Sequence, residues 1–269
     1  MKLINDILSV PRRCPERAVR HRAAWRRATA AGLGWLLALP SLPLAQPQVG
    51  AARTMLVSVW DRANRPTVDV GPDDFVVEEG NDERDILAVQ VADYPVTLLL
   101  DNGTDSDTLA RMREAALRFV RRIGQRPVAV ATLAGPPAGL ATFDDERSQV
   151  IDVIERLQAT PGAAARPLGA LAQAAEWIRA RRPPFSVVVL LATRPADPAD
   201  QPDTDRLGPI VESGAAVHVV ALLPVTGAAI EGPDLFRTVA EQTRGAFTPI
   251  YAPVSFGIAL DRLADRLSA

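Results

Sequence analysis

The sequence of 269 residues predicts an α/β fold, with a doubly wound, mostly parallel sheet preceded by a small antiparallel β module. Three observations predict it. From about residue 94 onward, continuous apolar runs of strand length alternate with amphipathic segments of helix length. Residues 46–92 hold short β-rich runs separated by turn residues, with no helical pattern between them. The composition, 48% hydrophobic and 23% charged, is that of a chain with a core to bury.

Residues 1–45 are expected to be a secretion signal. They hold eight of the 30 basic residues and two of the 32 acidic ones, and an apolar stretch at 30–40 leads to a small residue suited to cleavage, Ala45. This stretch is short for a membrane span, so we expect an exported product, periplasmic or secreted, without stable membrane insertion after cleavage. An uncleaved anchor is the alternative.

The charge of the remaining chain excludes one class of partner. Residues 46–269 carry a net charge of −8, whereas nucleic-acid binding depends on a basic face that neutralises phosphates. We therefore expect no nucleic-acid partner.

The small β-rich module is expected to span residues 46–92. Its four apolar or alternating runs are each bounded by turn residues such as Asp, Asn, Pro and Gly, which predicts four short antiparallel strands. These strands are expected at 55–60, 67–70, 74–79 and 86–91.

The α/β domain is expected to span residues 93–269. Its strands are expected at 96–100, 128–133, 139–143, 185–191, 216–223 and 246–250. Its helices are expected at 107–123, 144–157, 167–180, 234–243 and 254–267, with one more ending near residue 214. An acidic, proline-rich loop at 195–205 is expected to be solvated.

Several kinds of chemistry are missing from the sequence. The single cysteine, Cys14, and the single lysine, Lys2, both lie in the expected signal. Only one histidine follows the signal, His218, and it lies within an expected buried strand, where a catalytic base is unusual. No serine-hydrolase elbow or phosphate-binding glycine loop occurs. We therefore expect a non-enzymatic protein without a cofactor.

The expected strand at 96–100 is followed by Asp101-Asn102-Gly103-Thr104-Asp105, and a later segment at 240–247 reads Ala-Glu-Gln-Thr-Arg-Gly-Ala-Phe. In these motifs and in the order of its elements, the stretch from residue 94 resembles a von Willebrand factor A domain. Residues 74–80 read Asp-Phe-Val-Val-Glu-Glu-Gly, before a Pro-Val-Thr-Leu-Leu-Leu-Asp run. This pattern is similar to the acidobacterial VWFA-related subgroup.

The resemblance implies a metal site, which this sequence only partly retains. In the family, Mg²⁺ is held by Asp-x-Ser-x-Ser, a loop threonine and a later aspartate. Here Asp101 is present, but Gly103 and Asp105 replace the serines, Arg166 stands near the threonine position, and Ala-Thr-Arg at 192–194 replaces Thr-Asp-Gly. We expect a degenerate site without tight divalent binding; a weak ion at Asp101 and Asp105 is the alternative. A further hypothesis pairs one of these aspartates with Arg166 or Arg194.

Ligands of open doubly wound sheets bind at the carboxyl ends of the strands, near the point where strand order reverses. We therefore expect a protein partner to contact the loops at this end of the sheet. The expected contact residues are Asn102, Gly103, Thr104, Asp105, Arg166, Thr193 and Arg194. Three alternatives remain open: a metal-dependent adhesin, an unrecognised hydrolase using Asp101 or Asp105, and a scaffold factor binding through Trp60 and Phe75 of the β module.

Overall fold

The computed structural model describes residues 52–63, 65, 67, 69–134, 139–194, 204–224 and 234–268. The expected signal at 1–45 and most of the acidic loop at 195–205 lie outside these residues. The structure is a mixed α/β fold, as predicted, with a mostly parallel sheet flanked by helices and a small separate antiparallel sheet.

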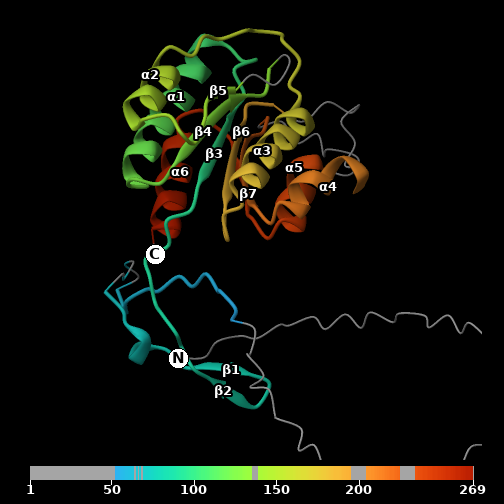
Figure 1. Ribbon diagram of the computed structural model, residues 1–269. Helices are drawn as coiled ribbons and strands as arrows, with labels where there is room; N and C mark the ends of the chain where they lie inside the picture. Colours follow the sequence, from blue (N-terminus) through green and yellow to red (C-terminus); the bar gives the residue numbers. More distant parts are fainter. Residues whose placement is uncertain are drawn as a thin grey trace, which may run out of the picture. The chain divides into compact units, whose positions relative to one another are not determined.

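The main sheet has six strands in the order β5-β4-β3-β6-β7-β8 (Figure 1). All neighbours pair in parallel except β4 and β5. The strands are β3 (Val96–Leu100), β4 (Val128–Thr132), β5 (Gly139–Ala141), β6 (Val187–Ala192), β7 (Ala216–Leu222) and β8 (Phe247–Ile250). β3, β4 and β6 are buried at every residue, which explains their continuous apolar sequences.

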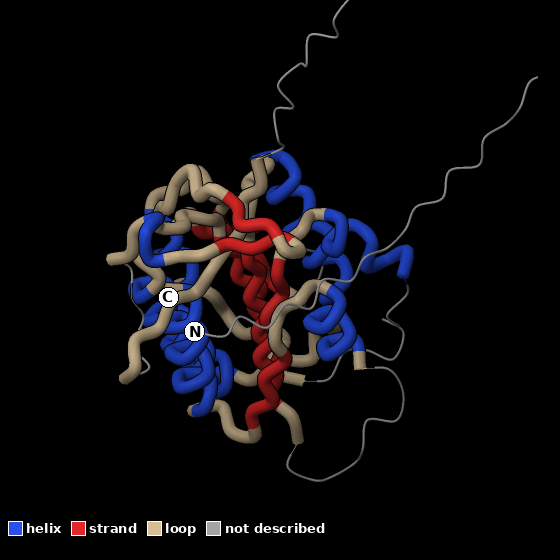
Figure 2. Tube along the Cα trace, turned by 90° about the horizontal axis from the view of Figure 1, so that it is seen from below, coloured by secondary structure: helices blue, strands red, loops and turns tan. Residues whose placement is uncertain are grey.

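Helices cover both faces of the sheet, which forms the central layer (Figure 2). One face packs against α1 (Ser106–Arg122), α2 (Arg147–Glu155) and α6 (Ser255–Leu267). The other packs against α3 (Pro167–Arg181), α4 (Thr204–Glu212) and α5 (Leu235–Gln242). Successive strand residues divide between the two cores, so that Leu98 joins the first and Leu99 the second.

The winding of the chain creates one switch point. After β3 the chain places β4 on one side, and it later returns to place β6 on the other. The loops that follow β3 and β6 therefore leave the same edge of the sheet side by side, since Leu100 is paired with Leu191. This is the edge at which we expected the functional residues.

The described residues before the domain form fewer strands than the sequence predicts. It contains a hairpin of β1 (Val77–Glu79) and β2 (Asp82–Arg84), preceded by a 3₁₀ turn at Pro72–Asp74. The described residues of 55–60, 67–70 and 86–91 form no strand; Trp60 makes only an isolated bridge, and the backbone N–H of Thr67 donates to the Val59 carbonyl (2.9 Å). The strands predicted at 55–60 and 86–91 are therefore wrong, and Val68 of the run at 67–70 lies outside the described residues.

The physical reason is the lack of an opposing layer. The apolar side chains of these runs, including Met55, Leu56, Leu87 and Val91, are exposed. Alternating sequence alone does not hold a strand that buries nothing. Gly80 and Asn81 form the turn of the hairpin, because Gly80 has a φ of +70° and lets the chain reverse within two residues, and β2 begins at Asp82.

Candidate functional site

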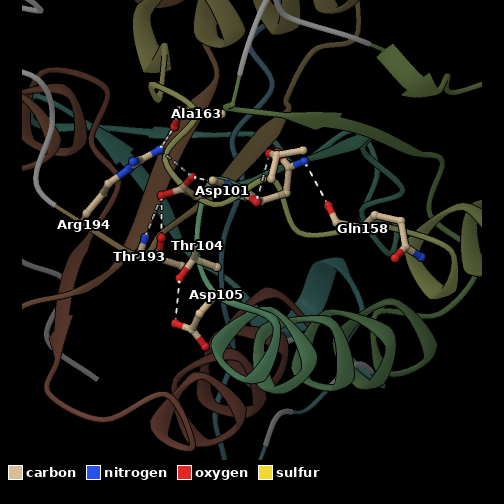
Figure 3. A network of polar contacts seen from close by, with 10 residues as sticks. Asp101, Thr104, Asp105, Gln158, Ala163, Thr193 and Arg194 are labelled. Carbon is tan, nitrogen blue, oxygen red and sulfur yellow. Dashed lines mark hydrogen bonds and ion pairs between the residues drawn. The ribbon is translucent and has the colours of Figure 1, made fainter.

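Asp101 is the centre of a polar cluster at the switch point (Figure 3). It follows β3 directly, and its side chain is buried. Its Oδ1 accepts a hydrogen bond from the Gly103 backbone N–H (3.0 Å). Its Oδ2 accepts from the backbone N–H and the hydroxyl of Thr193 (3.2 and 2.6 Å), which follows β6. The carboxylate therefore joins the two loops of the switch point.

Arg194 supplies the positive charge for this carboxylate. Its Nη2 lies 3.7 Å from Oδ1 of Asp101, and it donates to the carbonyl oxygen of Ala163 in the loop before α3. The Asp101 side chain is 1% exposed and that of Arg194 33%. Of the ion pairs that the sequence suggested, this one forms.

Gly103 makes room for that guanidinium. A Cβ atom at this position would overlap Nη2 of Arg194 and lie 2.6 Å from the Ala163 carbonyl oxygen. Any larger residue, serine included, would displace the arginine. The glycine at 103 and the arginine at 194 are therefore physically coupled.

Asp105 has a different role, at the start of α1. Its Oδ1 accepts from the backbone N–H groups of Asp107 (3.0 Å) and Thr108 (2.8 Å), and the Thr104 hydroxyl lies 3.4 Å from Oδ2. The hydrogen bonds from Thr108 hold the pKa of the Asp105 carboxyl below its usual value. This carboxylate is an N-cap of the helix and forms no ion pair with Arg166 or Arg194 among the described residues.

Asn102 fastens the loop at 156–166 to the switch point. Its Nδ2 donates to the Gln158 carbonyl (3.2 Å), and its own carbonyl accepts from the backbone N–H of Thr160 (2.8 Å). The same loop is held at Ala163 by Arg194. Sequence reasoning missed these partners, because their contacts use main-chain atoms that leave no trace in residue identity.

Arg166 lies at the end of this loop, directly before α3. Its backbone N–H donates to Leu133 (2.7 Å), while its side chain is exposed. The structure thus separates the expected contact residues. Asn102 and Gly103 are buried; Thr104, Thr193 and Arg194 are partly exposed; Asp105 and Arg166 are exposed.

The cluster fits a divalent ion poorly. Mg²⁺ requires oxygen ligands in near-octahedral geometry. Here Gly103 offers no side-chain oxygen, Asp101 already accepts three hydrogen bonds, and the Arg194 guanidinium lies against it. Over the described part of the chain, no group of three acidic, histidine or cysteine residues could hold a metal. The arrangement suits an internal cation, supplied by Arg194.

Fold and site together define an open α/β domain with a polar switch-point face. No protein-family model matches the sequence, and no curated protein matches it either. Solved structures do match. A von Willebrand factor type A protein from Catenulispora acidiphila is 15% identical, with a TM-score of 0.52 over 67% of this chain and 44% of that one. The mussel byssus protein PTMP1 is 12% identical, with a TM-score of 0.52 over 65% of this chain and 48% of that one.

A third match is the vWF domain of the type V pili tip protein Mfa5 from Porphyromonas gingivalis. It is 11% identical, with a TM-score of 0.50 over 65% of this chain and 95% of that one. The chain thus has a von Willebrand factor A-like fold, as the resemblance implied. It spans less than half the length of the first two proteins. No helix in the described ranges has both the length and the apolar character needed to cross a bilayer.

Proposed function

We propose that this protein is an exported, non-enzymatic interaction module whose switch-point face binds a protein partner without a divalent ion. The observation that carries the proposal is the Asp101–Arg194 pair, seated over Gly103 and fixed by Thr193. We further propose that the protein belongs to the acidobacterial VWFA-related subgroup and that its metal site is degenerate. Export rests on the basic and apolar pattern of residues 1–45.

The face combines a rigid base with charged groups that remain accessible. Asp101, Asn102, Gly103 and Thr193 hold three loops together through hydrogen bonds. Preorganised loops lose little conformational entropy when a partner binds. The residues left to contact a partner are Thr104, Asp105, Arg166 and Arg194.

The solved neighbours support a binding role. A byssus matrix protein and a pilus tip protein share the fold, and their names describe structural or surface roles. Both carboxylate oxygens of Asp101 accept hydrogen bonds, and Asp105 caps a helix, which disfavours either as the catalytic group of a hydrolase. The metal-dependent adhesin, with an ion at Asp101 and Asp105, remains the alternative function.

The test uses the full chain with cross-linking and capture of envelope proteins, in the presence of Mg²⁺ or of a chelator. We expect the same partner in both conditions, and loss of it when the exposed cation is reversed by Arg166→Glu. Arg111→Glu is the matched control, since it reverses an exposed arginine on the outer side of α1.

A parallel thermal unfolding series with Mg²⁺, Mn²⁺ or Ca²⁺ separates the two functions. An ion at about 100 times its Kd would stabilise the fold by about 2.7 kcal/mol, which is readily detected. We expect no shift. A metal-dependent rise in melting temperature, with capture lost in chelator, would establish the adhesin instead; capture unchanged in Arg166→Glu would remove the proposed face.

A further inference from the structure

A groove lies at the opposite end of the strand order from β5, between α6 and the strands β7 and β8. Its volume is about 520 Å³. Apolar residues form much of its wall, among them Ile250, Ile258, Ala259 and Leu263. Tyr251 and Ile258 are 60% and 58% exposed, so the apolar wall continues onto the open surface. The groove shares no residue with the switch-point face.

The aspartates and the arginines of helix α6 lie on different sides of the helix. Asp261 and Asp265 turn toward α1, where they pair with Arg118 (3.0 Å) and Arg122 (2.8 Å). Arg262 and Arg266 instead line the groove. Both are exposed, and neither has an ion pair within the described residues.

This arginine pair is unfavourable on its own. Like charges four residues apart on a helix repel each other and destabilise it slightly. The domain has acidic residues in excess, yet none of those in the described part of the chain forms an ion pair with these two guanidinium groups. The pair therefore lacks the counter-charge that an anionic ligand would supply.

The groove also contains a polar atom without a partner. His218 lies on β7, on the same side of the sheet as Val220 and α6. Its Nδ1 is buried and has no hydrogen-bond partner in the described structure. Burial, together with the charge of Arg266, lowers the pKa of His218 to about 4, so the ring is neutral at physiological pH. A neutral imidazole and two guanidinium groups thus border one apolar groove.

The edge strand limits how a peptide can bind here. The carbonyls of Ala246 and Ile250 accept hydrogen bonds from β7, so the backbone groups of Phe247 and Pro249 face the free edge of β8. Proline has no N–H to donate, which disfavours addition of another strand. Recognition must therefore rely on side chains.

We propose that the groove between α6 and β8 binds an acidic segment with apolar side chains, presented by a protein partner. The acidic groups pair with Arg262 and Arg266, and the apolar ones cover Tyr251 and Ile258. Charge complementarity supports this occupant. A small ligand normally buries most of its surface in its site, whereas Tyr251 and Ile258 of this groove are more than half exposed, which suits a chain that extends over the surface. The inference does not depend on the function of the switch-point face.

The test measures binding of a short fluorescent peptide of alternating leucine and aspartate to the full chain. We expect saturable binding that weakens as salt is raised, and that falls by about tenfold or more in the charge reversal Arg262→Glu/Arg266→Glu. The matched control is Arg111→Glu/Arg121→Glu, the same change of charge on the exposed side of α1. The control should bind as the unchanged protein does.

A leucine–lysine peptide supplies the converse measurement. It should bind the reversed variant better than it binds the unchanged protein. Acidic-peptide binding that is absent, or equally weakened in both double variants, would overturn the proposal. Octanoate that binds this groove as tightly as the acidic peptide would overturn its peptide part, by identifying a small carboxylate as the occupant.

Discussion

The switch-point face and the α6–β8 groove use similar charged groups in opposite ways. At the switch point, Asp101 accepts three hydrogen bonds and has Arg194 beside it, so the charges satisfy one another inside the protein. In the groove, Arg262 and Arg266 face outward and His218 Nδ1 has no partner among the described residues. The first arrangement orders loops, whereas the second leaves interactions for another molecule. Substitutions should therefore affect stability at the switch point and binding at the groove.

The largest effect on stability is expected from Asp101→Asn. The amide keeps one acceptor oxygen but places an NH₂ group against the donors of Gly103 or Thr193, and it leaves Arg194 without its counter-charge. We expect a loss of about 3 kcal/mol in the free energy of unfolding, measured by urea denaturation. The comparison is Arg266→Gln, which should stay within about 0.5 kcal/mol. Equal losses in the two variants would contradict the contrast between the regions.

A smaller loss is expected from Gly103→Ser, because its Cβ would overlap the guanidinium of Arg194. Forcing these groups apart should destabilise the protein by about 2 kcal/mol. Adding Arg194→Ala should make the serine better tolerated, so that the double variant loses less than the two single variants summed. Strict additivity in this double-mutant cycle would show that the glycine and the arginine are not coupled.

The smallest effect near neutral pH is expected in the groove, from the titration of His218, because its proton uptake begins to matter only as the pH falls below 6.5. Its pKa in the folded state, about 4, lies below the ordinary value of 6.5. The unfolded chain therefore takes up this proton first, and stability falls as the pH is lowered from 6.5 toward 4. Arg266 is the charged group that acts on the ring, and Arg262 and Tyr251 line the same groove.

The measurement is the unfolding free energy against pH for the unchanged protein and for His218→Gln. Carboxylates titrate in the same range in both proteins, so the informative quantity is the difference between the two curves. The unchanged protein should lose more stability than the variant over this window. Parallel curves would show that the imidazole is not held neutral by the fold.

The α/β part of the fold was predictable because its evidence is local. Runs such as 187–192 are apolar throughout, and a strand covered on both faces requires this. The start of α3 at Pro167 and the place of Asp101 directly after β3 were also visible in the sequence. The same reasoning predicted too many strands in the module at 46–92, since its exposed runs have β-like composition but, among its described residues, only β1 and β2 form a paired sheet.

The candidate site was predicted in position but not in detail. The sequence placed Asp101, Arg166 and Arg194 at one edge of the sheet, without deciding which charges pair. The structure pairs Asp101 with Arg194, uses Asp105 as a helix cap, and brings in the carbonyl oxygen of Ala163. The contacts of Arg194 with Asp101 and Ala163 join loops that are far apart along the chain, so no local pattern records them, whereas the cap by Asp105 is a local contact.

The sequence by itself determined the alternation of buried strands and amphipathic helices, and with it the edge where the loops after β3 and β6 meet. Periodicity and burial are properties of neighbouring residues, which is why they can be read along the chain. Only the tertiary structure decided that the guanidinium of Arg194 lies against Gly103. It also decided that the aspartates of α6 pair with α1 while its arginines line the groove. Those outcomes depend on distances between segments that meet only when the chain folds.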